Sequence, residues 1–138
     1  MRRILADTGP LVAIFSPQDE YHDICVEALR DLPGPMFSCW PILTEAAWLL
    51  RNTQGQIEEM LEGVSAGLVE LLPISSMEAR SVAKLMARYK DLRPQLADAA
   101  LVYLAERENI DTIFTLDRRD FAVYRIDGKR SFHIIPEQ

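Results

Sequence analysis

The chain has 138 residues, a length typical of one compact domain, and 49 % of them are hydrophobic, which is sufficient for a core. Its formal net charge of −6 argues against a protein that binds polyanions broadly through a basic surface. The charge does not exclude a site at which metal ions supply the positive charge locally. We therefore expect one domain that spans residues 1–138.

The sequence lacks a recognisable zinc motif and a long apolar segment. Cys25 and Cys39 form no CxxC pair, and His22 and His133 are far apart in the sequence, so a zinc site has little support. We expect both cysteines to be small buried residues of a protein that works in the reducing cytoplasm. The longest apolar run, residues 99–105, is much shorter than a membrane span, so we expect no membrane association.

The predicted elements alternate between strands and helices along the chain. In order, the patterns predict a strand at 4–6, helices at 11–15 and 19–32, a strand at 36–39, helices at 41–51 and 57–66, a strand at 68–74, helices at 77–89 and 94–108, a strand at 112–116 and a last strand at 132–135. Asp127-Gly128 predicts a hairpin turn before that last strand. Strands separated by helices predict an α/β fold whose mainly parallel sheet is covered on both faces.

Four carboxylates occupy positions where their neighbours predict apolar residues or turns. Asp7 follows the first strand, Asp117 follows the strand at 112–116, and Asp98 interrupts an apolar helix. Glu45 lies near the start of another apolar helix. Because ligands of an open α/β sheet collect beyond the carboxyl ends of its strands, we expect the four acids to share one crevice. Acids gathered in this way stay ionised only if cations join them, which predicts a divalent metal and chemistry on a phosphate ester.

Several of these acids also have a simpler structural explanation. Asp7 can cap the helix that follows it, and Asp117 can begin a turn. Asp98 can belong to a structural salt bridge, because a buried carboxylate without a partner is strongly destabilising. Asp120 competes with Asp117 for the functional role. Asp91 is a weaker candidate, since proline breaks the helix between it and Asp98, and it more simply caps or precedes that helix.

The helix at 41–51 is expected to be buried on most sides because both of its faces are largely apolar. Glu45 lies in about its first turn, where the helix dipole favours a negative charge. A solvated glutamate fits such a helix poorly, which makes Glu45 a candidate site residue. Core packing is the simplest explanation for the large apolar residues Trp48 and Leu61.

Three other classes of protein are alternatives to a metal site. A phosphotransferase of the haloacid-dehalogenase type needs a second aspartate two residues after Asp7, where this chain has Gly9. A receiver domain needs a phospho-acceptor aspartate after a middle strand, and the third strand here ends in Leu72-Pro73-Ile74-Ser75. A non-catalytic partner-binding module stays open. It predicts no metal-dependent activity and no loss of function when Asp98 becomes asparagine.

The sequence resembles the PIN-domain ribonucleases, and most closely the VapC-type toxins of toxin–antitoxin pairs. The segments that carry the resemblance are Asp7-Thr8, Thr44-Glu45-Ala46, Tyr89-Lys90-Asp91-Leu92, Leu96-Ala97-Asp98-Ala99, Thr115-Leu116-Asp117-Arg118-Arg119 and Asp120-Phe121-Ala122-Val123-Tyr124-Arg125. They span nearly the whole chain, with the acids in the order found in the family. The resemblance implies a three-layer α/β/α sandwich and an endoribonuclease that depends on Mg²⁺ or Mn²⁺ and hydrolyses phosphodiester bonds. It also implies that Asp7, Glu45, Asp98 and Asp117 are the catalytic acids.

The expected chemistry assigns a role to each of these acids. One or two Mg²⁺ or Mn²⁺ ions activate water and neutralise phosphoryl oxygens, and Mg²⁺ prefers oxygen ligands. We expect Asp7 and Asp98 to be direct ligands and Asp117 to hold a second ion or a bound water. Glu45 is expected to orient or deprotonate the attacking water.

Residues beside the four acids are expected to support them. Thr8 and Thr115 are candidate hydrogen-bond donors to the ligands. Arg118 and Arg119 are candidate contacts to the RNA backbone, although two solvated arginines in a turn explain them equally well.

The resemblance also implies partners for the protein. These are an RNA substrate such as a tRNA or an rRNA, a cognate antitoxin protein and a second copy of the chain in a homodimer. An arginine of the antitoxin is expected to enter the acidic cleft and pair with Asp7, Asp98 or Asp117. The alternative within the same family is a housekeeping RNA-processing nuclease.

Overall fold

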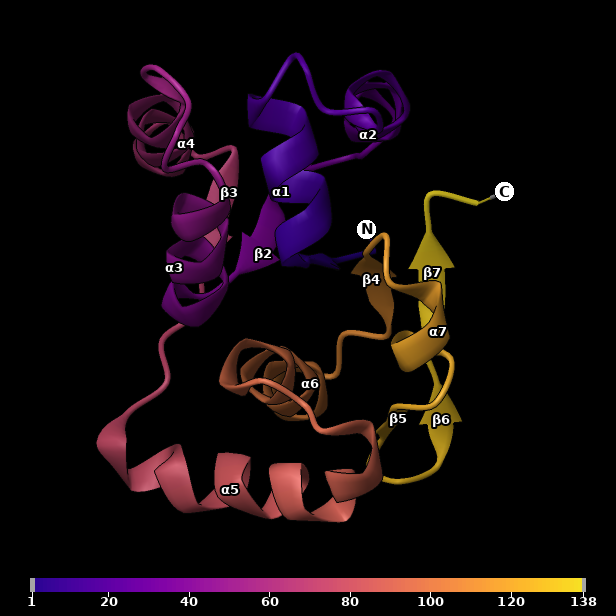
Figure 1. Ribbon diagram of the computed structural model, residues 1–138. Coiled ribbons are helices and arrows are strands. Elements are labelled where there is room, and N and C mark those ends of the chain that lie inside the picture. Colours follow the sequence, from indigo (N-terminus) through magenta and orange to yellow (C-terminus); the bar gives the residue numbers. More distant parts are fainter. Residues whose placement is uncertain (1, 138) are drawn as a thin grey trace.

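The computed structural model describes residues 2–137, and a parallel sheet lies at its centre (Figure 1). Its five strands are β1 (Ile4–Ala6), β2 (Met36–Ser38), β3 (Val69–Leu71), β4 (Thr112–Phe114) and β7 (His133–Ile135). Their spatial order is β3-β2-β1-β4-β7, and each neighbouring pair is parallel. Two further strands, β5 (Arg125–Ile126) and β6 (Arg130–Ser131), form the hairpin that the Asp-Gly pair predicts.

Helices cover both faces of the sheet (Figure 1). One face carries α1 (Thr8–Phe15), α2 (His22–Arg30), α3 (Trp40–Leu49) and α4 (Gln56–Ser65), and the other carries α5 (Ala79–Arg88) and α6 (Leu96–Glu108). Right-handed crossovers produce this division, because the chain moves from β1 to β3 and then returns past β1 to β4. The predicted three-layer α/β/α sandwich with a mainly parallel sheet is confirmed.

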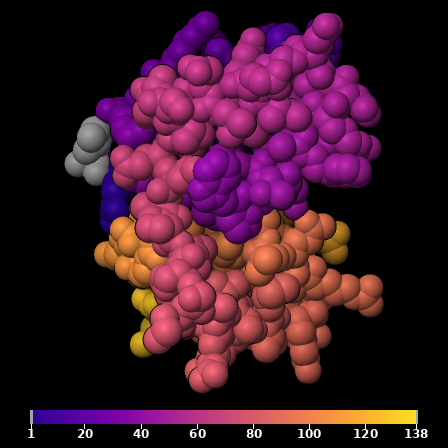
Figure 2. All heavy atoms as spheres, turned by 90° about the vertical axis from the view of Figure 1, so that its left-hand side faces the viewer, coloured from indigo at the N-terminus to yellow at the C-terminus, as the bar shows by residue number. Residues whose placement is uncertain are grey.

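Short helical segments complete the chain. They are the 3₁₀ turns η1 (Ser76–Glu78) and η2 (Lys90–Leu92) and the four-residue helix α7 (Arg118–Phe121). Figure 2 shows the face on which residues of α3 and α4, in purple and magenta, lie above those of α5, in salmon. Within residues 2–137, no helix is both long enough and apolar enough to cross a membrane.

The core lies on both sides of the sheet, which is why the central strands are almost entirely apolar. Every residue of β1 and β4 is buried, as expected for parallel strands that helices cover on both faces. Cys25 and Cys39 are free thiols, and both are buried, as predicted from the sequence.

The sheet contains a switch point between β1 and β4. The chain leaves β1 toward one edge of the sheet and later reaches β4 on the opposite side of β1. In this register Ala6 lies beside Phe114, and the backbone N–H of Asp7 donates to the carbonyl of Phe114 at 2.9 Å. The residues that follow β1 and β4, Asp7 and Thr115, are therefore neighbours. A switch point of this kind opens a crevice beyond the carboxyl ends of the strands.

Several predicted boundaries differ from the structure. The helix predicted over 19–32 begins at His22, because the carboxylate of Asp19 accepts the Tyr21 N–H at 2.9 Å in a preceding turn. The strand predicted over 68–74 ends at Leu71, since Pro73 has no N–H to donate to a ladder. The residues after Asp117, expected to form a turn, instead form the short helix α7.

The expectation that α3 is buried on most sides is wrong. Ile42 and Ala46 are buried, whereas Trp48 is 64 % and Leu49 is 54 % exposed. On α4, Leu61 is 40 % exposed, so core packing explains neither Trp48 nor Leu61. The sequence pattern cannot distinguish a buried helix face from an exposed one, because the apolar residues are the same whether protein or solvent contacts them.

Candidate active site

A cleft of about 770 Å³ lies beyond the carboxyl ends of β1 and β4. Five carboxylates line it, and they come from the end of β1, from α3, from α6 and from the segment after β4: Asp7, Glu45, Asp98, Asp117 and Asp120. Within residues 2–137, Arg93 is the only basic residue among those that line the cleft. The fold thus brings the four acids singled out in the sequence to one cleft and adds Asp120 to them.

Asp7 is the most deeply buried of these acids, with 6 % of its surface exposed. It occupies the N-cap position of α1, but within the described residues its side chain makes no capping hydrogen bond. Its Oδ2 instead accepts the hydroxyl proton of Thr115 at 2.8 Å. Its Oδ1 is buried and has no hydrogen-bond partner within residues 2–137. Capping therefore does not explain Asp7, and one of its oxygens is free to bind a ligand.

Burial and neighbouring charges keep the pKa of Asp7 well above the ordinary value for an aspartate. Burial is the main cause and raises the pKa from 3.8 to about 6, although the hydrogen bond from Thr115 opposes it. The carboxylates of Asp98 and Glu45 raise the pKa of Asp7 further. A cation in the cleft would relieve both effects.

Thr115 connects the two strand ends that meet at the switch point. Its hydroxyl donates to Asp7 and accepts the backbone N–H of Asp117 at 2.9 Å. Asp117 in turn caps α7, where its Oδ1 accepts the backbone N–H of Asp120 at 3.1 Å. The pKa of Asp120 is raised by burial first and then by Asp117. One chain of hydrogen bonds therefore runs from Asp7 to Asp120 along the cleft.

Asp98 occupies the third position of α6 and approaches the cleft from the opposite layer. Its Oδ2 accepts the backbone N–H of Gln95 at 3.3 Å in a capping box. Within residues 2–137 no salt bridge to Asp98 occurs, so the predicted structural alternative of an ion pair is wrong. Burial is the main cause of its raised pKa, and Glu45 and Asp117 raise it further.

Glu45 lies deeper in its helix than the sequence indicated. Because α3 begins at Trp40, Glu45 falls in the second turn, and the first turn contains no acid. The helix dipole acts mainly on the first turn, so it does not explain Glu45. Glu45 is half-buried at the cleft, three residues before the exposed Trp48 on the same side of the helix.

Some residues named from the sequence do not take the places expected for them. Asp91 is exposed in η2 and does not line the cleft. The guanidinium of Arg118 donates to the carbonyl of Pro136 at 2.8 Å, which ties α7 to the end of the chain, and Arg119 is exposed outside the cleft. Thr8 lines the cleft, but its buried hydroxyl has no partner within the part of the chain that is described.

Sequence reasoning missed Arg93, which lines the cleft between η2 and α6. Its backbone has φ 50° and ψ 56°, a left-handed conformation that is uncommon for residues other than glycine. It also precedes Pro94, and residues before proline favour extended backbone. The one signal in the sequence was a basic residue between Asp91 and the helix of Asp98, and this signal does not predict the direction of the turn.

The carboxylates at the cleft fit a hard cation. Within residues 2–137, no three metal-ligating side chains are already assembled as a closed site. Mg²⁺ does not need such a site, because it retains several waters and requires only one or two direct carboxylates. The free buried oxygen of Asp7 and the raised pKa values of Asp7 and Asp98 are the features that a bound cation would satisfy.

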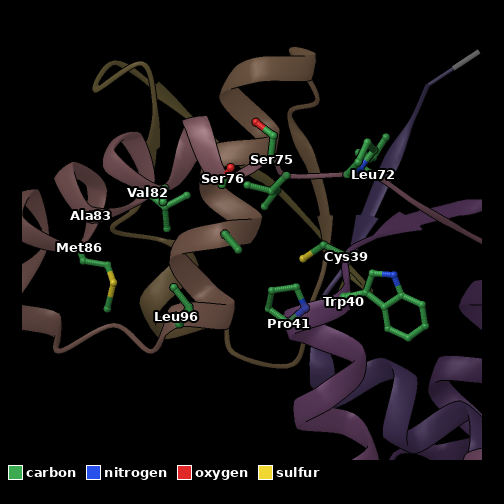
Figure 3. A pocket seen from close by; sticks show the side chains of 14 residues that line it. Cys39, Trp40, Pro41, Leu72, Ser75, Ser76, Val82, Ala83, Met86 and Leu96 are labelled. Atoms are coloured by element: carbon green, nitrogen blue, oxygen red, sulfur yellow. The ribbon is translucent and has the colours of Figure 1, made fainter.

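A separate apolar pocket of about 380 Å³ lies between α3, α5 and α6 (Figure 3). Trp40 and Met86 stand at its opposite ends, with Val82 and Leu96 between them. None of the described residues that line it is an acid, a histidine, a lysine or an arginine. This pocket therefore has no group for the chemistry that the acidic cleft can perform.

Comparison with known proteins identifies the family. The model of the PIN domain matches residues 4–128. The chain belongs to the PIN-domain family. Over 135 residues it is 30 % identical to Ribonuclease VapC26 of Mycobacterium tuberculosis, a match that covers 96 % of this chain and 100 % of that protein. The predicted resemblance to PIN-domain ribonucleases of the VapC type is therefore confirmed.

A solved structure shares the fold of this PIN domain. The crystal structure of Mycobacterium tuberculosis VapC20, a toxin that cleaves the sarcin–ricin loop, superposes with a TM-score of 0.80. The two chains are 16 % identical, and the match covers 92 % of this chain and 98 % of that chain. At this identity the likeness concerns the fold alone, and it supports the arrangement of strands and helices described above.

Proposed function

We propose that the protein is an endoribonuclease that depends on Mg²⁺ or Mn²⁺ and acts as the toxin of a toxin–antitoxin pair. The observation that carries the proposal is the cleft in which five carboxylates meet at the switch point of the sheet, one of them with a free buried oxygen. Membership of the PIN-domain family and the 30 % identity to a ribonuclease support RNA as the substrate.

In this proposal Asp7, Asp98 and Asp117 hold one or two divalent ions. A bound ion lowers the pKa of water and neutralises charge on the phosphoryl oxygens. Asp7 uses its free Oδ1, while the hydroxyl of Thr115 fixes the orientation of its carboxylate through Oδ2. Glu45 accepts the proton of the attacking water, since it faces the same cleft from the side of α3.

Asp117 rather than Asp120 is the proposed ligand, and the hydrogen bonds support this choice. Asp117 is fixed twice, by the Thr115 hydroxyl at its backbone and by the Asp120 N–H at its Oδ1, which leaves Oδ2 for the cleft. The bond between these two residues uses the backbone N–H of Asp120 and not its carboxylate, so Asp120 is proposed to hold bound water. Asp117→Asn is therefore expected to lower cleavage more than Asp120→Asn does.

The test is RNA cleavage by the purified protein with Mg²⁺, followed by analysis of the new ends. Attack by water on phosphorus leaves a 5′-phosphate and a 3′-hydroxyl, whereas attack by the ribose 2′-hydroxyl leaves a cyclic phosphate. Loss of an outer contact to a metal ligand lowers activity by about 10- to 100-fold, so loss of a ligand in Asp98→Asn should lower it by more than about 100-fold. The exposed Asp91→Asn is the control and should retain activity. Cyclic ends, or full cleavage in EDTA, would refute the mechanism.

We further propose that the RNA target is a tRNA or an rRNA, so that the protein acts in the cytoplasm, and that it works as a homodimer. The proposed antitoxin inserts an arginine into the acidic cleft, where a guanidinium pairs with carboxylates and displaces the metal. Co-expression with the product of the adjacent gene should end growth arrest and yield a complex. Persistent arrest without a complex would favour a housekeeping RNA-processing nuclease.

A further inference from the structure

The wall of the acidic cleft contains a tryptophan that the proposed hydrolysis does not use. Trp48 lines the cleft three residues after Glu45, and 64 % of its surface is exposed. Positions three apart on a helix lie on the same side, about 4.5 Å apart along the axis. Large exposed apolar groups at a concave site mark surfaces that bind something. Trp48 is thus placed to meet a ligand that also reaches Glu45.

Arg51 holds this indole in position. Its guanidinium carbon lies 3.9 Å from the centre of the Trp48 ring, and its Nη1 donates to the Trp48 carbonyl at 2.8 Å. The guanidinium covers one face of the indole, and the rest of the ring is available to a ligand. A flat aromatic surface backed by a fixed positive charge suits a planar ligand with a nearby negative charge.

A second positive charge lies on the rim of the same cleft. Arg93 is the only basic residue that lines the cleft within residues 2–137, and its left-handed backbone is costly before Pro94. Such backbone conformations are concentrated at functional sites, where the surrounding structure enforces them. Arg51 and Arg93 therefore supply positive charge beside a cleft that is otherwise lined by five acids.

We propose that Trp48 and Arg51 form a stacking platform for an unpaired nucleobase of the RNA beside the cleaved phosphate, and that Arg93 contacts the adjacent backbone. The proposal rests on the ribonuclease function and deepens it, because it assigns the side chains that hold a base beside the cleaved bond. A base inside a duplex offers no free face for stacking, whereas a splayed base does.

The charge of the protein favours this mode of binding. A chain with net charge −6 gains less from long-range attraction to an RNA backbone than a basic protein does, so an interaction that does not depend on net charge matters more for its affinity. Stacking on an aromatic ring does not depend on the net charge of the protein. Trp40, at the other end of α3, is similarly exposed but borders the apolar pocket of Figure 3, which has no charged lining residue within the described chain.

The two tryptophans make the test direct, because the chain contains only these two. Trp40→Phe leaves Trp48 as the sole fluorophore, and Trp48→Phe leaves Trp40 as the matched control. Each protein is titrated with a single-stranded RNA octamer of mixed sequence and with an RNA duplex of the same length, with Ca²⁺ in place of Mg²⁺ to slow cleavage. Stacking of a base on the indole quenches its fluorescence, so single-stranded RNA should quench Trp48 and leave Trp40 unchanged.

Affinity and kinetics provide the second measurement. Stacking contributes enough that Trp48→Ala should weaken binding of the octamer by about 10- to 100-fold, while Trp40→Ala should not weaken it. In cleavage assays Trp48→Ala should raise KM with little change in kcat, and Trp48→Phe should recover part of the loss. A substitution that merely destabilised α3 would lower kcat as well and would not be rescued by phenylalanine.

The outcomes separate this proposal from the ribonuclease function. Equal binding by wild type and Trp48→Ala, or quenching by duplex as strong as by single strand, would overturn the platform even if the wild type cleaves RNA. Binding through Trp48 without cleavage would support the platform and refute the nuclease. If RNA leaves Trp48 unquenched but the protein from the adjacent gene quenches it, the surface docks a protein and the proposal is overturned.

Discussion

Replacing Asp7 with asparagine should stabilise the metal-free protein at neutral pH, although it removes a proposed metal ligand. Asp7 is 6 % exposed, and burial raises its pKa from 3.8 to about 6. Because the folded state holds the proton more tightly than the unfolded state, the contribution of Asp7 to stability is most favourable below pH 3.8. It is lost as the pH rises from 3.8 to about 6.

The size of the effect follows from this difference in pKa. A shift from 3.8 to about 6 corresponds to about 3 kcal/mol of lost stability at pH 7.5, at 1.36 kcal/mol for each pKa unit. Asparagine keeps an oxygen to accept the Thr115 hydroxyl, but its NH₂ group then takes the place of Oδ1, which has no partner within residues 2–137. That costs about 1 kcal/mol, so the net gain is about 2 kcal/mol. It corresponds to a rise of about 4–8 °C in Tm.

Thermal unfolding of wild type and Asp7→Asn in EDTA, at several pH values, measures this effect. The gain should be present at pH 7.5, shrink through pH 6 and disappear by pH 4. Asp91→Asn, at an exposed position away from the cleft, is the control and should change little at any pH. With Mn²⁺ at about 100 times its Kd, the wild type should gain about 2.7 kcal/mol and overtake the variant.

Two results would refute this reasoning. If Asp7→Asn is less stable than wild type in EDTA at pH 7.5, burial does not disfavour the charged carboxylate. If the difference in stability does not change with pH, the ionisation of Asp7 does not cause it.

Two further substitutions test the structure around the cleft. Thr115→Val removes the hydroxyl that bonds both Asp7 and Asp117, so urea unfolding at pH 7.5 should show a loss of about 2 kcal/mol, whereas Thr115→Ser should keep most of the stability. A Thr115→Val protein as stable as the wild type would mean that this bridge contributes nothing. Tyr124→Phe removes a buried hydroxyl without a partner within residues 2–137, so the free energy of unfolding should stay equal or rise by up to about 1 kcal/mol. A loss greater than 1 kcal/mol would reveal a partner for this hydroxyl.

The sequence predicts the layers of the fold because its strands and helices have clear signatures. The strand at 4–6 is apolar and is closed by a turn signal, and the strand at 112–116 is equally clear. Strands that alternate with helices leave few arrangements other than a parallel sheet. These signatures do not predict that Asp7 and Thr115 are neighbours, because that depends on β4 pairing with β1. No local pattern encodes that pairing.

Other features of the site could not be predicted from the sequence, and the physical reason differs from one residue to the next. The exposure of Trp48 depends on what packs against α3, and Arg93 reaches the cleft through a left-handed turn that an arginine before proline rarely adopts. The sequence leaves either a basic partner or a metal open for Asp98, because its carboxylate accepts the backbone N–H of Gln95, and a backbone donor has no signature in the sequence. For Arg118 the sequence favours an RNA contact and a solvated turn equally, and the structure shows a third arrangement, in which its guanidinium donates to the carbonyl of Pro136.

Binding of Mn²⁺ to the wild type and to Asp98→Asn, measured by calorimetry, tests most directly whether the acidic cleft is a metal site. Asp98 is half-buried, keeps Oδ1 outside its capping bond and faces Glu45 and Asp117, so it is expected to be a direct ligand. The wild type should bind Mn²⁺, the exposed control Asp91→Asn should bind it equally well, and Asp98→Asn should lose most of the binding. Equal Mn²⁺ affinity in the wild type and Asp98→Asn would contradict the assignment of the metal to this cleft.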